Sequence, residues 1–173
     1  MSSKKKQKPR RITHSEKIKA NTGNDRKFNY ALDYKKINLR DNPELYRVGV
    51  GEQGVLLVEP YKSEILPFWK FKTPALAFTS ATAIYKLFLR YLKNEDFIGM
   101  DMARKYLQMG FTRSRRYANH KSGAKYNSKQ IVLPLNIDRQ KAISAEIFFK
   151  HWKKAERNPH YADAKLHWRY AFG

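Results

Sequence analysis

Apolar residues in the second half of the chain recur every three or four positions, which is the spacing of an amphipathic helix. The clearest series follows Thr73 and Pro74 and includes Ala77, Ile84 and Phe88. A threonine suits the N-cap of a helix and a proline suits its first position. The pattern therefore predicts a helix that begins at Pro74.

Three further helices are predicted from the same spacing and from residues typical of helix ends. One begins near Asn94 and is expected to end at Gly110, because glycine suits a helix C-terminus. Another is capped by Asp138 and ends before Asn158, and a last amphipathic segment covers residues 161–170. The C-terminal half is therefore expected to be mainly helical.

The N-terminal half has a different pattern. Aromatic and aliphatic residues alternate over 28–34, and residues 46–50 and 55–59 flank a loop with glycines at both ends, Gly51 to Gly54. Alternation predicts a strand and the glycine loop predicts a β-hairpin; residues 131–135 are a further candidate strand. We therefore predict an α+β fold, with a small antiparallel sheet or hairpin followed by helices.

Charge changes this picture at the N-terminus. The 173 residues carry 36 Lys and Arg against 15 Asp and Glu, a net charge of +21. Residues 1–27 are basic with little apolar content and are predicted to be a disordered arm, because they cannot bury enough surface to offset their ordering entropy. Residues 28–173 are predicted to form a single compact domain that is also basic. Such a surplus favours a polyanionic partner.

The candidate binding surface combines cations with aromatic residues between 101 and 129. Cations neutralise phosphates and aromatic rings stack on unpaired bases, so this mixture favours DNA or RNA contacted mainly through its phosphates. The alternative is that the aromatic residues are core and the arginines pair with carboxylates. The predicted contacts are Lys4, Lys5, Lys6, Arg10 and Arg11 in the arm, and Arg104, Lys105, Arg113, Arg115, Arg116, Tyr117, His120, Lys121, Lys125 and Tyr126 in the domain.

Catalytic and cofactor sites have weaker support. Gly49 to Gly54 matches G-x-G-x-x-G, but a predicted strand follows where a dinucleotide site needs a helix, so a hairpin turn is favoured. The chain has no cysteine, and its five histidines lack metal-binding spacing, so no metal or cofactor is predicted. An enzyme that processes nucleic acid around Asp101 and His120 stays open as an alternative, without an assigned catalytic residue.

Three ungapped stretches resemble a known family: residues 42–74 (NPELYRVGVGEQGVLLVEPYKSEILPFWKFKTP), residues 96–120 (DFIGMDMARKYLQMGFTRSRRYANH) and residues 147–155 (IFFKHWKKA). They are similar to domain-of-unknown-function family 4385, seen in bacteria and bacterial viruses, over roughly residues 28–170. The resemblance implies a compact intracellular domain in a bacterial or phage setting and implies no activity. The basic arm lies outside the similar region.

Taken with the charge, these observations predict a nucleic-acid-binding protein in the cytoplasm of a bacterial or phage-infected cell, with no membrane partner. No secretory signal and no membrane-spanning run is expected, because the most apolar stretch contains Lys86 and Arg90. The alternative to simple binding is a phage virion or assembly component that meets packaged genome or an acidic protein.

Overall fold

The computed structural model describes residues 27–173, and the regular secondary structure of that part is helical throughout. Its long helices are α3 (Pro74–Lys93), α4 (Phe97–Asn119), α5 (Arg139–Glu156) and α6 (Pro159–Phe172). Short helices precede them: η2 (Pro43–Leu45), α2 (Tyr61–Ile65) and η3 (Leu66–Phe68). Residues 27–173 thus have an all-helical fold without a strand, and the predicted α+β fold with a small sheet is wrong.

The segments predicted as strands form turns and irregular structure. Gly51 and Gly54 do form turns, with φ of 60° and 80°, but the chain after them turns again because the Leu57 and Val58 amides both donate to the Gly54 carbonyl. The candidate strand 131–135 contributes only an isolated antiparallel bridge, between Tyr126 and Val132. Tyr46, Val48, Val55 and Val58 of the supposed hairpin belong to the same buried core as the helices, so these positions reflect packing of a loop.

Side-chain caps fix where the long helices begin. The Thr73 hydroxyl accepts from the Leu76 amide, and the Asp96, Asp138 and Asn158 side chains accept from the third residue beyond them. Each cap satisfies an amide that has no partner inside its helix. The predicted helices starting at Pro74 and after Asp138 are confirmed, with the latter ending before Asn158 as expected.

Gly110 lies inside α4 and does not end it, so the predicted C-terminus of that helix is wrong. A Cβ atom at this position would lie 2.2 Å from Cδ1 of Phe148 on α5. Glycine therefore allows the two helices to approach closely, and α4 continues for about two and a half further turns. The continuation carries Arg113, Arg115 and Arg116.

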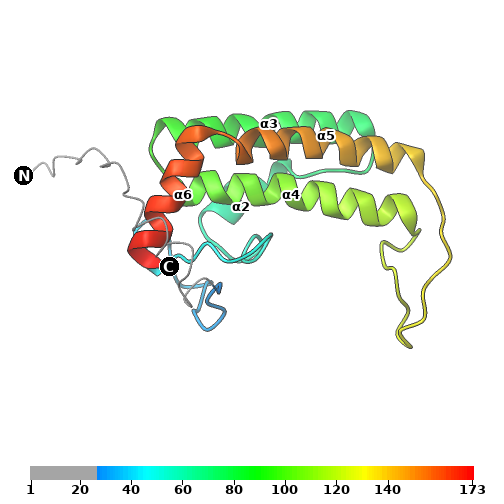
Figure 1. Cartoon of the computed structure of the whole chain (residues 1–173), viewed down its shortest axis with the longest axis horizontal. Helices are drawn as coiled ribbons and strands as arrows, with labels where there is room; N and C mark the ends of the chain where they lie inside the picture. The colour runs from blue at the N-terminus through cyan, green and yellow to red at the C-terminus, as the bar shows by residue number, and fades with distance from the viewer. Residues whose placement is uncertain (1–26) are drawn as a thin grey trace, which may run out of the picture.

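The three helices α3, α4 and α5 lie side by side, with α6 across one end (Figure 1). Ile84 and Phe88 from α3, Met102 and Tyr106 from α4 and Phe148 from α5 are buried between them. The chain runs in opposite directions in α3 and α4, because only residues 94–96 connect them. The start of α3, the end of α4 and the start of α5 therefore meet far from α6.

We call the part formed by residues 69–76 and 113–141 the distal end. It includes the long loop 120–138 between α4 and α5, which projects from the helices (Figure 1). None of the helices within residues 27–173 combines the length and apolar character that a membrane span requires.

Candidate nucleic-acid interface

The first half of α4 carries a buried group of charges around Asp101. Asp101 and Lys105 are 0% exposed and Arg104 is 3% exposed. One carboxylate oxygen accepts from Arg104 Nη2 at 2.9 Å, and the other lies 3.3 Å from Lys105 Nζ. The hydroxyl groups of Tyr46 and Tyr161 also donate to Asp101, that of Tyr161 at 2.6 Å. Both carboxylate oxygens are thus occupied by the protein's own donors.

The two cations of this group also hold the glycine loop against α4. Lys105 Nζ donates to the carbonyl oxygens of Val48 and Gln53 at 2.6 and 2.7 Å, and Arg104 Nη1 donates to the Gly51 carbonyl at 3.3 Å. These carbonyls belong to the segment that matched a phosphate-loop pattern. The segment therefore presents acceptors to a buried ammonium and is part of the packing of the protein.

The expected exposure of Arg104 and Lys105 is therefore wrong. The spacing of Asp101, Arg104 and Lys105, three and four residues apart on one helix, places the three side chains together. A phosphate cannot reach them without displacing the core around them. We exclude both cations from the interface proposed below.

Electrostatics of the group follow from burial and charge pairing. Burial would raise the pKa of Asp101, but the adjacent Lys105 and Arg104 charges outweigh it and hold this pKa well below its usual range. Burial lowers the pKa of Lys105 to about 8, against the opposing effect of Asp101. Burial also raises the pKa of Tyr46 and Tyr161, so both hydroxyls stay protonated donors.

The last turns of α4 carry a second set of cations, and these are exposed. Arg113, Arg115 and Arg116 are exposed, and none of the three forms a salt bridge within residues 27–173. Lys121 and Lys125 are exposed in the following loop, likewise without an ion pair among the described residues. Between residues 105 and 145 the sequence contains a single acid, Asp138.

The remaining predicted contacts lie close to this second set. Tyr117 is half-buried on the last turn of α4, and Tyr126 is 47% exposed in the loop, with Lys125 Nζ 5.4 Å from its ring centroid. His120 caps α4 and is 7% exposed, with Nδ1 3.2 Å from the Pro134 carbonyl oxygen. Tyr117, Lys121, Lys125 and Tyr126 thus accompany the arginines at the distal end, while His120 is largely covered.

Asp101 and His120 do not converge on a shared site. They are nineteen residues apart on one continuous helix and its cap, which corresponds to about 28 Å along the axis. Asp101 is enclosed by its own donors, and His120 faces the 120–138 loop. Within residues 27–173 there is also no group of three His, Cys, Asp or Glu side chains placed to hold a metal ion. The geometry therefore gives no support to a catalytic pair made from these two residues.

An aromatic pocket opens at the distal end, with a volume of about 440 Å³. Its wall is a row of three half-buried rings: the Trp69 and Phe71 centroids are 5.0 Å apart, and those of Phe71 and Tyr117 are 5.9 Å apart. Lysines surround the rings, and no carboxylate from residues 27–173 lines the space. The lining residues are Trp69, Lys70, Phe71, Lys72, Leu76, Tyr117 and Lys141.

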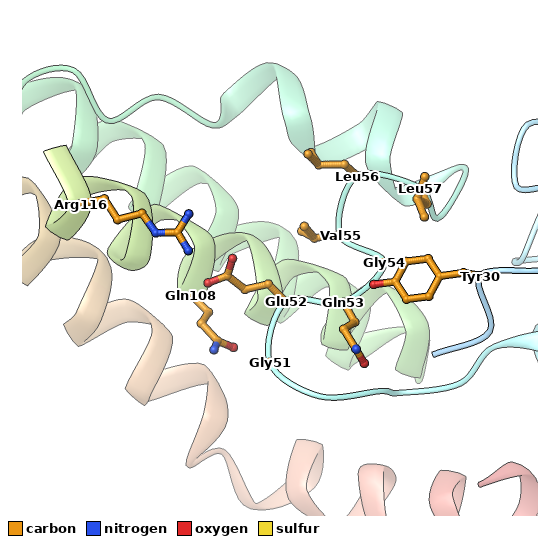
Figure 2. Close-up of a pocket in the computed structure, with 10 residues that line it drawn as sticks. All are labelled: Tyr30, Gly51, Glu52, Gln53, Gly54, Val55, Leu56, Leu57, Gln108 and Arg116. Atoms are coloured by element: carbon orange, nitrogen blue, oxygen red, sulfur yellow. The ribbon is translucent and has the colours of Figure 1, made fainter. Parts of the chain in front are cut away.

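A second hollow, of about 520 Å³, lies between the glycine loop and α4 (Figure 2). Arg116 reaches over it from α4, and Figure 2 shows its guanidinium directed toward the Glu52 carboxylate. Glu52 also accepts from the Thr112 hydroxyl at 2.5 Å. The acid on the floor makes this hollow less suited to a phosphate than the aromatic pocket.

Sequence reasoning missed the aromatic pocket because its residues come from three separate segments. The signal was nevertheless present in the run Phe68-Trp69-Lys70-Phe71-Lys72, where aromatic and cationic residues alternate before α3. Lys141 was missed for the same reason, since it lies on the first turn of α5 and donates to the Lys72 carbonyl across the pocket. The predicted arm contacts Lys4, Lys5, Lys6, Arg10 and Arg11 lie outside the described residues.

The fold and this surface define a class of protein: an all-helical domain with exposed cations and half-buried aromatic rings gathered at one end of its described part. The chain belongs to the family described as Domain of unknown function (DUF4385), which matches residues 29–171. No curated protein and no solved structure matches the chain. Family membership therefore adds no activity to the residues themselves.

Proposed function

We propose that this protein binds DNA or RNA mainly through phosphates, at the distal end. The supporting observation is the separation of charge along one helix: cations near the start of α4 are buried in salt bridges with a carboxylate, whereas Arg113, Arg115 and Arg116 are exposed and form no salt bridge within the described part of the chain. Unpaired arginines can approach phosphate oxygens and release condensed counterions. Lys121, Lys125 and Lys129 extend the same charge along the loop.

The position of the arginines on the helix suits an extended polyanion. With about 100° between successive residues, Arg113 and Arg116 are separated by about 60° around the axis, and Arg115 lies about 100° from Arg116. The three guanidinium groups therefore spread over the solvent face of α4 and cannot all converge on one small anion. A backbone with regularly spaced phosphates can contact several of them together.

Equilibrium binding of the full-length chain to a fluorescein-labelled 20-nucleotide DNA or RNA tests the proposal. Removing three phosphate contacts by Arg113→Ala, Arg115→Ala and Arg116→Ala is expected to weaken binding by up to about a hundredfold at 0.1 M monovalent salt. That figure assumes about fivefold per contact from counterion release by a single strand. Unchanged affinity of a folded triple variant would contradict the assignment.

The chain offers a charge-matched control on α3. Lys86, Arg90 and Lys93 are exposed and lie toward the opposite end of the helices, so replacing them by alanine removes the same charge from another surface. A smaller loss of affinity in this control is expected. Equal losses in the two triple variants would show that net charge, and not the distal end, determines binding.

A structural or assembly role is the second candidate, and one observation favours it. The 120–138 loop exposes Ile131, Leu135 and Ile137, the last two by 71% and 74%. Neighbouring exposed apolar side chains are typical of protein contact sites. Co-sedimentation of the chain with assembled particles tests this role. The role predicts that replacing Leu135 and Ile137 by serine abolishes co-sedimentation while oligonucleotide binding persists. Equal co-sedimentation of the wild type and the variant would contradict it.

A further inference from the structure

The aromatic pocket at the distal end is lined by three rings that are tilted relative to one another, by 53° between Trp69 and Phe71 and by 40° between Phe71 and Tyr117. Trp69 and Phe71 lie in the segment before α3, and Tyr117 lies on the last turn of α4, so two separate parts of the chain supply one row of rings. All three are half-buried, which leaves part of each ring accessible from the pocket. Exposed aromatic faces of this kind stack on bases of any sequence.

Contacts behind the row hold it in place. A Cβ atom on Gly123 would lie 2.8 Å from Cζ of Tyr117, so the loop backbone packs directly against that ring. Lys141 Nζ lies 5.7 Å from the Phe71 ring centroid and donates to the Lys72 carbonyl. The rings therefore require little reordering on binding, which lowers the entropic cost of association.

Charge around the pocket restricts what can occupy it. Lys70, Lys72 and Lys141 line it, and none of them pairs with a carboxylate within residues 27–173. An uncharged apolar ligand would use the rings and leave the ammonium groups without a counterion. A ligand that joins an aromatic ring to an anionic group uses both, and the nucleotide unit has this chemistry.

One proposed phosphate contact lies on the same helix as Tyr117, which lines the pocket. Arg113 precedes Tyr117 by four residues on α4, so the two side chains project from the same face of the helix. A strand whose phosphates contact Arg113 would bring its next base to Tyr117. A base within a duplex has both faces covered by its neighbours, so only an unpaired or extruded base can stack in the pocket.

We propose that the aromatic pocket binds an unpaired nucleobase and gives the protein a preference for single-stranded nucleic acid. This rests on the proposed function, because the pocket adds base stacking to phosphate contacts made beside it. Stacking is expected to be tolerant of sequence, because the only polar groups that residues 27–173 contribute to the pocket are the lysine ammonium groups, the Trp69 indole N–H and the Tyr117 hydroxyl.

Two oligonucleotides with the same number of phosphates separate the two proposals. The full-length chain is titrated with a labelled 12-nucleotide DNA strand and with an abasic strand of the same length. Tighter binding of the base-containing strand, by about fivefold to a hundredfold, is expected from one stacked base. Equal binding overturns the pocket assignment and leaves phosphate binding intact, whereas binding of neither strand overturns the proposed function itself.

Variants locate the preference in the pocket. Trp69→Leu and Tyr117→Leu keep an apolar side chain and remove a ring, so each should reduce the preference for the base-containing strand and leave affinity for the abasic strand unchanged. Phe78→Leu is the matched control, because Phe78 is 59% exposed on α3 and is not part of the pocket. Preference that persists in both pocket variants, with folding verified by circular dichroism, would assign base recognition to another surface and overturn the inference.

Discussion

The two halves of α4 carry similar residues and have opposite environments. Arg104 and Lys105 in the first half are enclosed with Asp101, two tyrosine hydroxyls and three backbone carbonyls. Arg113, Arg115 and Arg116 in the second half are exposed and form no salt bridge within the described residues. The same residue types therefore stabilise the packing of the fold in one place and form a candidate binding surface in the other.

The difference shows that a local carboxylate and a covering segment decide the role of a cation on a helix. Asp101 lies one turn before Arg104 and Lys105, and residues 48–53 cover them. No acid occupies the corresponding positions before Arg113 and Arg116, where Met109 and Thr112 stand. Counting charges over a segment averages these two environments together, which is why the sequence suggested one continuous basic surface.

Asp101→Asn should have the largest effect among the predictions. The substitution leaves two buried cations without their countercharge, and breaking a buried ion pair in this way costs about 3 to 5 kcal/mol of unfolding free energy. Urea denaturation followed by circular dichroism measures the change. Asp33→Asn is the control, because Asp33 is exposed in its ion pair with Lys36 and should matter far less. Equal stabilities of Asp101→Asn and the wild type would contradict the buried, charge-paired environment assigned to the first half of α4.

Acid should destabilise the protein through the same carboxylate. The folded pKa of Asp101 lies well below its value of about 3.9 in an unfolded chain. Between these two pKa values the unfolded state binds a proton that the folded state does not. The stabilisation from Asp101 is therefore fully present above about pH 4 and is lost as the pH is lowered. The free energy of unfolding should fall by up to about 1.4 kcal/mol per pH unit for this site. Denaturation curves at several pH values measure the slope.

The acid slope can be assigned with the Asp101→Asn variant. Glu59 and Glu64 also have lowered pKa values, owing to hydrogen bonds from Lys62, Ser63 and Arg40, and contribute a slope of the same sign. Removing Asp101 should therefore make the pH dependence shallower without abolishing it. An unchanged slope would show that the carboxylate is not held in its charged form by its neighbours.

Removing the exposed arginines should have the smallest effect on stability. Arg113→Ala, Arg115→Ala and Arg116→Ala delete side chains that face solvent without an ion pair in the part of the chain described, and such substitutions typically change stability by less than about 0.5 kcal/mol each. Thermal unfolding of the triple variant measures this. A strong destabilisation would place these arginines with Arg104 and Lys105 and remove the contrast between the two halves.

Much of the helical part could be predicted from the sequence, because its signals are local. Thr73 with Pro74, and Asp138, mark helix starts through contacts within one turn. The predicted helix end at Gly110 was wrong because the glycine is needed for tertiary packing: the Phe148 ring that leaves no room for a Cβ atom there lies on another helix. The predicted hairpin was wrong for a similar reason: Gly51 and Gly54 form turns, but Val48, Val55 and Val58 are buried in the same core as the helices and do not pair as strands.

The candidate site could be predicted only in part. The exposed arginines and loop lysines were identified from charge alone, whereas the burial of Arg104 and Lys105 follows from their spacing to Asp101 and could have been recognised. The aromatic pocket could not be predicted from the sequence, because Trp69 and Tyr117 are 48 positions apart and meet only through the packing of α3, α4 and α5.

The salt dependence of nucleic-acid binding tests the central claim most directly. For the full-length chain and a single strand, the slope of log affinity against log salt should become shallower by about 0.7 for each phosphate-binding side chain removed, or about 2 units in the Arg113, Arg115 and Arg116 triple alanine variant. The charge-matched Lys86, Arg90 and Lys93 variant should keep the wild-type slope. Identical slopes in the two variants would contradict the claim that the exposed end of α4 contacts phosphates.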